Sequence, residues 1–408
     1  NVMDEESREK ITGYTVEVKS GDTVCPAGED GKYSLYAGKY AYTVSASGYE
    51  TAKGEFTVTE TDLGVDVSMA RPGAWDGTTE QPEQVNGVYQ IANAKQLAWF
   101  AQKINAGGSR SLCAVLISDI VINDASTSNK WTPIQDDISG YGAAEEDRCE
   151  YTGTFDGKGH TVYGLTAPLF GNADKGSMIK NVTVTGTITG STNVGAICKT
   201  TYGDIESCVS YATITVNEKR TGGIAGLAYA GGSITNCINY GAITSTYATS
   251  SLAPGAKEAY IGGIVGYAYV RVETCANFGE VKATGDGISC VGGIAGYARV
   301  GYGAEAGSAY LLNCYNTGAV SAASKTGGIV GEAAVAVTNC YNTGAVTGGA
   351  IIGSSATGSS MTNCYYLTGS CTDGGSAAEK TETEMKSAAF VLTLGKAYGK
   401  DTTPNQNK

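Results

Sequence analysis

Histidine is almost absent from this chain of 408 residues, which contains one copy, His160. Zinc sites of the HExxH type need two histidines, so the sequence excludes them. A Ser–His or Cys–His catalytic pair would have to use His160, which lies between a turn and a strand in GTFDGKGHTVYGL, where we expect a structural role. The cysteines are too widely spaced for CxxC zinc pairs. We therefore expect no cofactor.

Long apolar runs are also missing. No stretch approaches the roughly 18 consecutive apolar residues of a membrane helix, and no signal peptide opens the chain. The formal charge of −12 weighs against nucleic acid or an anionic membrane as a partner. Because the sequence begins abruptly at NVMDEESREK and ends at TTPNQNK, we expect a piece of a larger surface polypeptide, and the missing signal peptide carries no information on location.

Phenylalanine is scarce, at 6 residues, whereas glycine and tyrosine number 58 and 26. This composition favours strands, turns and small interior residues over helical bundles. One segment recurs along the chain as TGGIAG at 221–226, IGGIVG at 261–266, VGGIAG at 291–296 and TGGIVG at 326–331, with degraded copies at 194–199 and 348–353. The chain is therefore built from repeats.

A second signature, such as VTNCYNTGAV at 337–346, follows each copy, and its cysteine marks one aligned column. The members are Cys208, Cys237, Cys275, Cys314, Cys340 and Cys364. We expect a ladder of buried free thiols, because cysteine packs as a small hydrophobe and parallel Cβ vectors suit a disulfide dihedral poorly. Cys198 and Cys290 are expected in the core, and Cys113–Cys149 and Cys364–Cys371 are conceivable bridges.

Two further columns follow the cysteine. The first is polar and lies two residues later: Ser210, Asn239, Asn277, Asn316 and Asn342. The second lies two residues beyond that: Ala212, Gly241, Gly279, Gly318 and Gly344. Because glycine tolerates positive φ and asparagine bonds to nearby backbone, we expect stacked turns here.

Short β-rich repeats of roughly 20 to 40 residues predict a solenoid whose repeats bury their apolar faces against their neighbours. A propeller fits less well because four strands per blade are missing, and a leucine-rich horseshoe because its helical half is missing. We therefore predict an all-β fold with a right-handed parallel β-helix. The open end needs a cap, and GVYQIANAKQLAWFAQKINAGG supplies a helix with Leu97, Phe100, Ala101 and Ile104 on one face and Asn93 as N-cap.

The N-terminal part differs from the repeats, because its alternating segments are broken by Gly and Asp turns and predict a small β-sandwich. Pro and Gly in ARPGAWDGTTEQPEQ indicate a linker. We divide the chain into a sandwich over 1–71, a linker over 72–84, a capped β-helix over 85–372 and a C-terminal helical tail over 373–408. The repeat copies span about 194–372.

These motifs carry a family resemblance. WDGTT, VYQIANAKQLAWFAQKINAG, WTPI, YTGTFDGKGHTVYGL, the GGIVG copies and NCYNTGAV resemble the GLUG-repeat family of large secreted or wall-attached bacterial proteins, also found in the non-protease part of some immunoglobulin A metallopeptidases. The likeness covers roughly residues 72–395. DGKYSLYAGKYAYTVSASGY resembles PEGA-like and carboxypeptidase-regulatory-like modules. The resemblance implies a bacterial surface or secreted protein with a β-helical stalk or adhesive region, and it implies no activity.

A polysaccharide lyase or glycosidase is the enzymatic alternative, because many such enzymes are β-helices. That chemistry needs clustered carboxylates, and we expect that the acids across 194–372 do not share a column. A denser acidic group is expected to be a solvated loop, with calcium binding as the alternative: Asp136, Asp137, Glu145, Glu146, Asp147 and Glu150. We therefore expect no catalytic residues and no established metal site.

Differences between repeats are the places where a ligand could be recognised. After the GGI segment the copies read GLAYA, GYAYV and GYARV, which aligns Tyr267 with Tyr297 and Tyr229 with Tyr269 and Arg299. With the nearby Tyr302, these residues form a candidate sugar platform, although stacked tyrosines also stabilise a β-helix by packing alone. The expected function is non-catalytic adhesion or display, with a glycan or host glycoprotein as partner; a structural stalk is the alternative.

Overall fold

The computed structural model describes most of the chain. The described residues are 1–4, 10–28, 32–46, 49, 51–59, 63–69, 73–107, 110–136, 150–190, 193–217, 219–247, 258–285, 288–301, 309–395 and 398. Within them strands dominate, and no helix is long and apolar enough to cross a membrane. The predicted all-β class is confirmed.

The N-terminal unit consists of two small sheets. An antiparallel sheet has the order β3-β2-β4-β5, and β1 pairs in parallel with β6. The bounds are β1 Val2–Asp4, β2 Thr15–Ser20, β3 Thr23–Cys25, β4 Gly38–Ser45, β5 Ala52–Val58 and β6 Val67–Met69. Val2 and Val67 from the parallel pair share a buried cluster with Val44 of β4, which confirms the predicted small sandwich.

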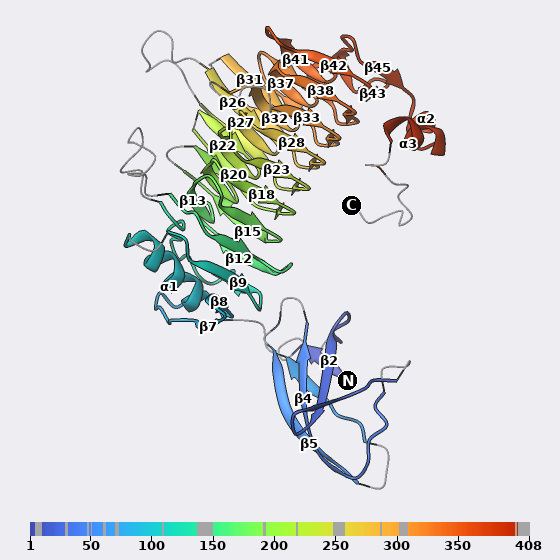
Figure 1. Cartoon of the computed structure of the whole chain (residues 1–408). Helices are drawn as coiled ribbons and strands as arrows, with labels where there is room; N and C mark the ends of the chain where they lie inside the picture. Colours follow the sequence, from blue (N-terminus) through green and yellow to red (C-terminus); the bar gives the residue numbers. More distant parts are fainter. Residues whose placement is uncertain are drawn as a thin grey trace.

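The described residues after Met69 form three long sheets, whose strands are parallel except for the antiparallel pair of β7 and β8 (Figure 1). The first sheet contains β13 Phe170–Ala173, β17 Cys198–Thr201, β22 Ala225–Ala228, β27 Val265–Ala268, β32 Ala295–Arg299, β37 Val330–Ala334 and β41 Ile352–Ser355. The second sheet contains β7 Glu83–Val85, β8 Val88–Ile91, β9 Cys113–Leu116, β11 Thr154–Asp156, β14 Met178–Lys180, β18 Asp204–Glu206, β23 Ser233–Thr235, β28 Arg271–Glu273, β33 Tyr310–Leu312, β38 Ala336–Thr338 and β42 Ser360–Thr362.

The third sheet is the longest. Its strands are β10 Ile120–Val121, β12 Thr161–Leu165, β15 Thr183–Ile188, β16 Val194–Gly195, β19 Val209–Ser210, β20 Thr213–Val216, β21 Arg220–Gly222, β24 Ile238–Asn239, β25 Ile243–Ser245, β26 Glu258–Gly262, β29 Ala276–Asn277, β30 Val281–Ala283, β31 Ile288–Gly292, β34 Tyr315–Asn316, β35 Val320–Ser321, β36 Thr326–Gly327, β39 Tyr341–Asn342, β40 Val346–Gly349, β43 Tyr365–Leu367, β44 Cys371–Asp373 and β45 Ala378–Lys380.

Each repeat forms one coil that visits all three sheets. The coil that starts at β26 continues through β27 and β28 and ends with β29 and β30. Each strand then pairs in parallel with its equivalent in the next coil, so that Val265 lies opposite Ala295 and Val272 opposite Leu311. Their side chains belong to one continuous buried core. This arrangement confirms the predicted parallel β-helix.

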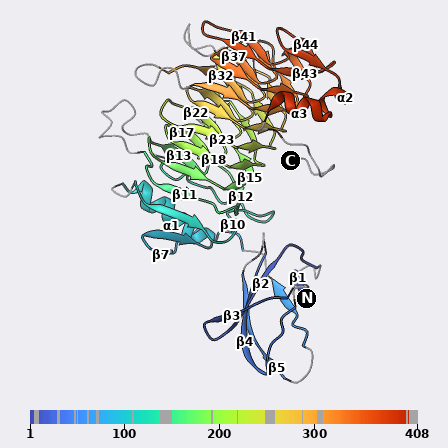
Figure 2. The same cartoon turned by 45° about the vertical axis from the view of Figure 1, so that its right-hand side comes forward.

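A helix covers the N-terminal end of the β-helix (Figures 1 and 2). This helix, α1, spans Ala94–Asn105, and the Asn93 side chain accepts a hydrogen bond from the backbone N–H of Gln96. Leu97, Phe100 and Ile104 are fully buried, and Phe100 lies against Phe155 of β11. The predicted helical cap is therefore confirmed, and it shields core that an open coil would expose.

The turn after the cysteine column differs from the sequence prediction. The positive φ expected for the column containing Gly279 is wrong, because the left-handed residues are instead those that precede the ladder cysteines, with φ from 53° to 55°. They are Ser207, Asn236, Thr274, Asn313, Asn339 and Asn363. Gly279 is required by close approach, since a Cβ there would lie 2.0 Å from the carbonyl oxygen of Gly241.

The polar column forms an interior ladder rather than a turn surface. Asn239, Asn277, Asn316 and Asn342 are fully buried. The Asn277 side-chain amide donates to the Asn316 amide oxygen at 2.8 Å and to the Gly279 carbonyl at 2.8 Å. Asn239 and Asn316 repeat both contacts, and Asn342, the last member, donates to the Gly344 carbonyl, so the ladder satisfies polar groups inside the core.

The C-terminal segment 373–408 is not wholly helical. β45 still belongs to the third sheet, pairing with β43, so strand structure continues to Lys380. Two short helices follow, α2 over Glu382–Met385 and α3 over Ala388–Leu394. Phe390 of α3 and Tyr398 pack against aromatic side chains on the outside of the β-helix. α3 and Tyr398 therefore lie against the side of the solenoid.

Candidate functional site

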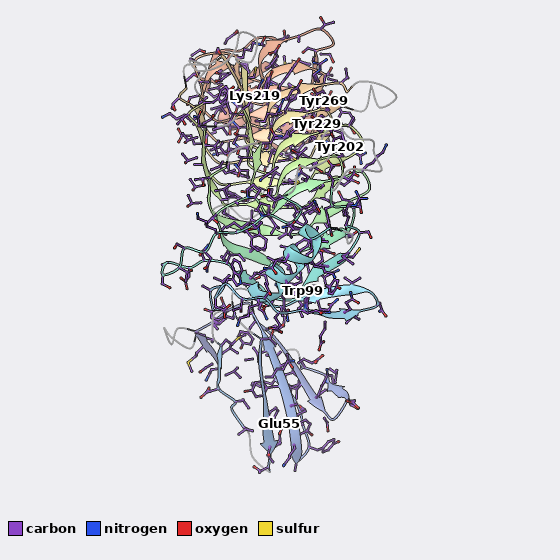
Figure 3. All side chains as sticks on the ribbon, turned by 90° about the vertical axis from the view of Figure 1, so that its left-hand side faces the viewer. Glu55, Trp99, Tyr202, Lys219, Tyr229 and Tyr269 are labelled. Carbon is purple, nitrogen blue, oxygen red and sulfur yellow. The ribbon has the colours of Figure 1, made fainter. Side chains whose placement is uncertain are left out.

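Three tyrosines form a stacked row on the outer side of the first sheet. Tyr202, Tyr229 and Tyr269 each lie directly after a strand of that sheet, in successive coils (Figure 3). Tyr202 and Tyr229 stack with centroids 4.5 Å apart and planes inclined by 11°, and Tyr229 and Tyr269 with 5.6 Å and 6°. All three are partly exposed. We call these residues the tyrosine row.

An arginine ends the row. Arg299 follows Tyr269 in the column, because Ala268 pairs with Ala298, and its guanidinium carbon lies 6.0 Å from the centre of the Tyr269 ring. Such a cation over an aromatic face is attractive by roughly 0.5–1 kcal/mol at an exposed site. The predicted alignment of Tyr229, Tyr269 and Arg299 therefore corresponds to contacts in space.

Of the other two predicted tyrosines that the structure describes, Tyr267 is buried and Tyr297 is partly buried. Tyr267 and Tyr297 pair across neighbouring strands and stack at 4.9 Å, and Tyr260 covers both. Tyr267 is only 7% exposed, so its expected part in a surface platform is wrong: the incoming strand β26 covers it. Tyr302 lies outside the described residues.

The geometry changes what the tyrosine row can bind. A sugar packs its C–H face on an open ring face, but stacking at 4.5 and 5.6 Å leaves the faces between neighbouring rings occupied. The row therefore offers ring edges and phenol groups to solvent. It suits hydrogen bonding along a line rather than the face-on platform expected from the sequence.

Several residues of this cluster were not apparent from the sequence. Tyr202 occupies the same column as Tyr229, but its repeat reads CKTTY and lacks the GGI pattern on which the alignment depends. Tyr260 and Arg220 share a column two residues before the glycine pairs, and Arg220 lies over Tyr267 at 5.7 Å. Reading the positions before each GGI segment as a column could have found both.

The thiol ladder lies inside the solenoid. Its six cysteines are free and buried, and each sulfur lies 3.2 to 3.4 Å from the carbonyl oxygen two residues earlier. Burial raises the pKa of the Cys208 and Cys237 thiols well above the usual range. The buried Cys198 thiol has its pKa raised to about 12 by the same desolvation. The thiols of Cys198, Cys208 and Cys237 therefore stay protonated at neutral pH and act as packing groups.

The structure describes both cysteines of one conceivable disulfide and only one cysteine of the other. Cys364 and Cys371 are both free, so that bridge is absent. Cys113 is also free, and its sulfur accepts a hydrogen bond from the Thr154 N–H. Cys149 lies outside the described residues. Cys290 is in the core of the tyrosine cluster, where its thiol donates to a Glu332 carboxylate oxygen at 3.4 Å.

The acidic residues give no metal centre in the described part of the chain. Asp136 forms an ion pair with Lys199, and Glu150 is buried. The other members of the suggested calcium loop, Asp137, Glu145, Glu146 and Asp147, lie outside the described residues. His160 hydrogen-bonds the buried Asp119 carboxylate at 3.1 Å, and the Thr161 N–H donates to the same oxygen.

The expectation that the acids across 194–372 share no column is wrong. Glu206 and Glu273 do share a column on the second sheet, with Thr235 between them. Both precede a ladder cysteine by two residues, so the alignment of IESC with VETC contains the signal. Strands spaced about 4.8 Å apart place their Cα atoms nearly 10 Å from each other. Tyr310 donates to Glu273 at 3.4 Å, and Leu312 is the next member of the column, so the two carboxylates do not form a pair.

A separate hollow lies in the N-terminal unit. Its volume is about 1050 Å³, and Val16, Val18, Tyr42 and Phe56 line it. The parallel pair of β1 and β6 buries Val44 but leaves this part of the antiparallel sheet open. Polar and apolar side chains both line the hollow, so it defines no particular ligand chemistry.

No family model matches the chain. Over 163 residues, or 37% of this chain and 2% of the relative, the sequence is 28% identical to halomucin of Haloquadratum walsbyi. The chain thus spans a small fraction of that relative's length.

Two solved structures are similar in part. One is a putative immunoglobulin A1 protease from Bacteroides ovatus, with a TM-score of 0.39, 20% identity, and coverage of 60% of this chain and 80% of that chain. The other is an IgA1 protease with a TM-score of 0.38, 14% identity, and coverage of 88% of this chain and 25% of that chain.

Proposed function

We propose that this chain is a non-catalytic module of a bacterial surface or secreted protein, which binds a glycan or a host glycoprotein along its tyrosine row. The observation that carries the proposal is the in-line stack of Tyr202, Tyr229 and Tyr269, ending at Arg299. Phenol and guanidinium groups repeat at about the strand spacing, which suits an extended chain of sugars lying parallel to the solenoid axis.

Two further points support a surface protein. The partial similarity to halomucin is in keeping with a surface or secreted location. The repeats also resemble GLUG repeats, and the N-terminal unit resembles a PEGA-like spacer, so we propose that the chain is built from these modules. A non-catalytic role is supported by the acidic side chains that the structure describes between residues 194 and 372, which are exposed or partly exposed.

The test is a glycan and glycoprotein array probed with the whole chain, followed by measured affinities of variants. Tyr229→Phe keeps the stacked ring and removes the hydroxyl, so we expect weaker binding with unchanged melting. The matched control is Tyr240→Phe, because Tyr240 also stacks on a tyrosine, Tyr211, at 4.7 Å, but in a different aromatic column. Binding that is equal in both variants and the parent would remove the tyrosine row as the site.

A structural stalk is the second candidate, and the asparagine ladder favours it. Its amides join successive coils from Asn239 to Asn342 through side-chain hydrogen bonds of 2.7 to 2.8 Å. Such a ladder opposes sliding and separation of coils, as a rigid spacer requires. An array on which no glycan or glycoprotein is retained, with the chain folded, would favour the stalk over the binding module.

A further inference from the structure

The C-terminal end of the β-helix carries no charge over a long stretch. Between Glu332 and Asp373 the sequence contains no Lys, Arg, Asp, Glu or His, and it contains no Pro. This stretch includes β41 and β42, which are the last strands of the first and second sheets. The chain as a whole is 17% charged, so the absence is concentrated at one end of the solenoid.

The same end leaves two strand edges without a neighbour in the described part of the chain. β41 pairs with β37 and β42 with β38, each along one side. In the preceding coils the N–H of the isoleucine after each glycine pair bonds to the following coil, as Ile329 does to Ile351. A second series of hydrogen bonds between coils is donated by the N–H groups of the left-handed residues, for example from Asn339 to the Thr362 carbonyl. Both series end with this coil, at Ile351 and Asn363.

Natural sheets protect open edges with charged side chains, proline or a covering element. The opposite end of the β-helix has such protection, because α1 covers its core and the β7–β8 hairpin ends the second sheet. At the C-terminal end, β44 and β45 extend the third sheet, while α3 packs on the side of the solenoid against Tyr341 and Tyr365. The edges of β41 and β42 therefore lack these devices.

We propose that two copies of this chain associate tail to tail, with β41 and β42 of one copy facing the same strands of the other across a twofold axis. Equivalent edges related by a twofold axis run antiparallel, so they can continue the first and second sheets by antiparallel pairing. This is the isologous contact typical of symmetric dimers.

The structure favours a second copy in this orientation over head-to-tail stacking. Head-to-tail stacking would bring the bare edges against α1 and the β7–β8 hairpin, which already cover the other end. Tail-to-tail contact instead brings together the edges of β41 and β42, which carry no charged side chain, while the charges at this end, Asp373, Glu379 and Lys380, lie on β44 and β45 of the third sheet. Uncharged edges matter because each chain carries a net charge of −12. Ile352 and Met361, which are only partly buried in one chain, would become more buried at this contact.

The experiment measures the mass of the whole chain by analytical ultracentrifugation over a wide concentration range. We expect a reversible dimer of the 41.8 kDa chain. The edge variant Ser360→Lys with Thr362→Lys places charges on β42, and we expect its dissociation constant to rise at least about tenfold. The matched control, Ala336→Lys with Thr338→Lys, carries the same charges one strand further in, on the register partners of those residues.

Each result decides the proposal. A parent dimer that the edge variant weakens and the control leaves intact supports it, as does concentration-dependent protection of the amide N–H groups of Met361 and Asn363 in hydrogen exchange. A monomer at all concentrations, open-ended oligomers, or equal weakening by both variants would overturn it. Circular dichroism of each variant verifies folding, and the exchange experiment on the parent needs no variant.

Discussion

Gly263 lies directly against the side-chain amide of Asn277, with so little room that a Cβ on Gly263 would come within 2.3 Å of the Asn277 Cγ atom. The same contact recurs between Gly223 and Asn239. The second glycine of each GGI segment and the asparagine after each cysteine are therefore two sides of one contact inside the coil. This contact explains why the glycine and the asparagine occur together in four repeats, whereas the two degraded copies have alanine in place of the second glycine and lack the asparagine.

The first prediction concerns the asparagine ladder. Asn277→Ala removes an amide that donates to Asn316 and Gly279 and accepts from Asn239, all inside the core. Buried groups left without partners cost about 1–3 kcal/mol each, so we expect the free energy of unfolding to fall by about 3 kcal/mol or more. Urea denaturation measures the loss. Thr215→Ala, on an exposed position, should change it by less than about 0.5 kcal/mol, and an equal effect of both variants would contradict the ladder.

The second prediction concerns the left-handed column. Thr274 has a φ of 55°, which is unfavourable for a β-branched residue, whereas the equivalent position in other repeats is often asparagine, as at Asn236. Thr274→Asn should therefore raise the free energy of unfolding by about 1 kcal/mol. Differential scanning calorimetry should show a higher Tm for Thr274→Asn and a lower Tm for Asn236→Val. A lower Tm for Thr274→Asn would show that backbone strain does not decide this position.

The sequence was sufficient to predict the solenoid because each repeat places the same residue types in the same structural positions. The cysteine, isoleucine and valine columns appear as columns only when the copies are aligned, and alignment is what a stacked coil imposes. The cap was predictable for a local reason, since Asn93 and the apolar spacing from Leu97 to Ile104 are properties of one helix.

The errors arose where a residue type has two physical uses. Glycine permits positive φ and also close approach, and only the structure shows that Gly279 serves the second use. The tyrosines could be aligned from sequence, but the burial of Tyr267 depends on β26 crossing over it. The alignment of the positions after each GGI segment does not contain that information, because the covering residue, Tyr260, precedes the segment.

The third prediction concerns alkaline pH. Burial raises the pKa of Cys208 and Cys237 above the ordinary value of 9.0. Their stabilising contribution is fully present below pH 9 and is lost as pH rises above it, because the unfolded chain releases thiol protons that the folded chain retains. Each thiol adds a slope of at most about 1.4 kcal/mol per pH unit.

The measurement is urea denaturation at a series of pH values above and below 9. We expect the Cys208→Ala and Cys237→Ala double variant to be less stable at neutral pH but to lose stability less steeply above pH 9. Val281→Ala is the control, because it creates a cavity in the same core and removes no thiol. Identical pH slopes in the parent and the double variant would show that these thiols ionise equally in both states.

The last prediction separates packing from recognition within the tyrosine cluster. Tyr267 is 7% exposed and stacks on Tyr260 and Tyr297, so Tyr267→Ala should cost about 3–5 kcal/mol, as for other buried aromatics. Tyr269→Phe keeps the stack on Tyr229 and removes a hydroxyl that donates to the Tyr267 hydroxyl at 3.0 Å, so its cost should be about 1 kcal/mol. Because coils depend mainly on their neighbours, hydrogen exchange should show the loss in Tyr267→Ala concentrated around β22, β27 and β32. Equal protection in both variants would mean that the inner tyrosines do not hold the first sheet together.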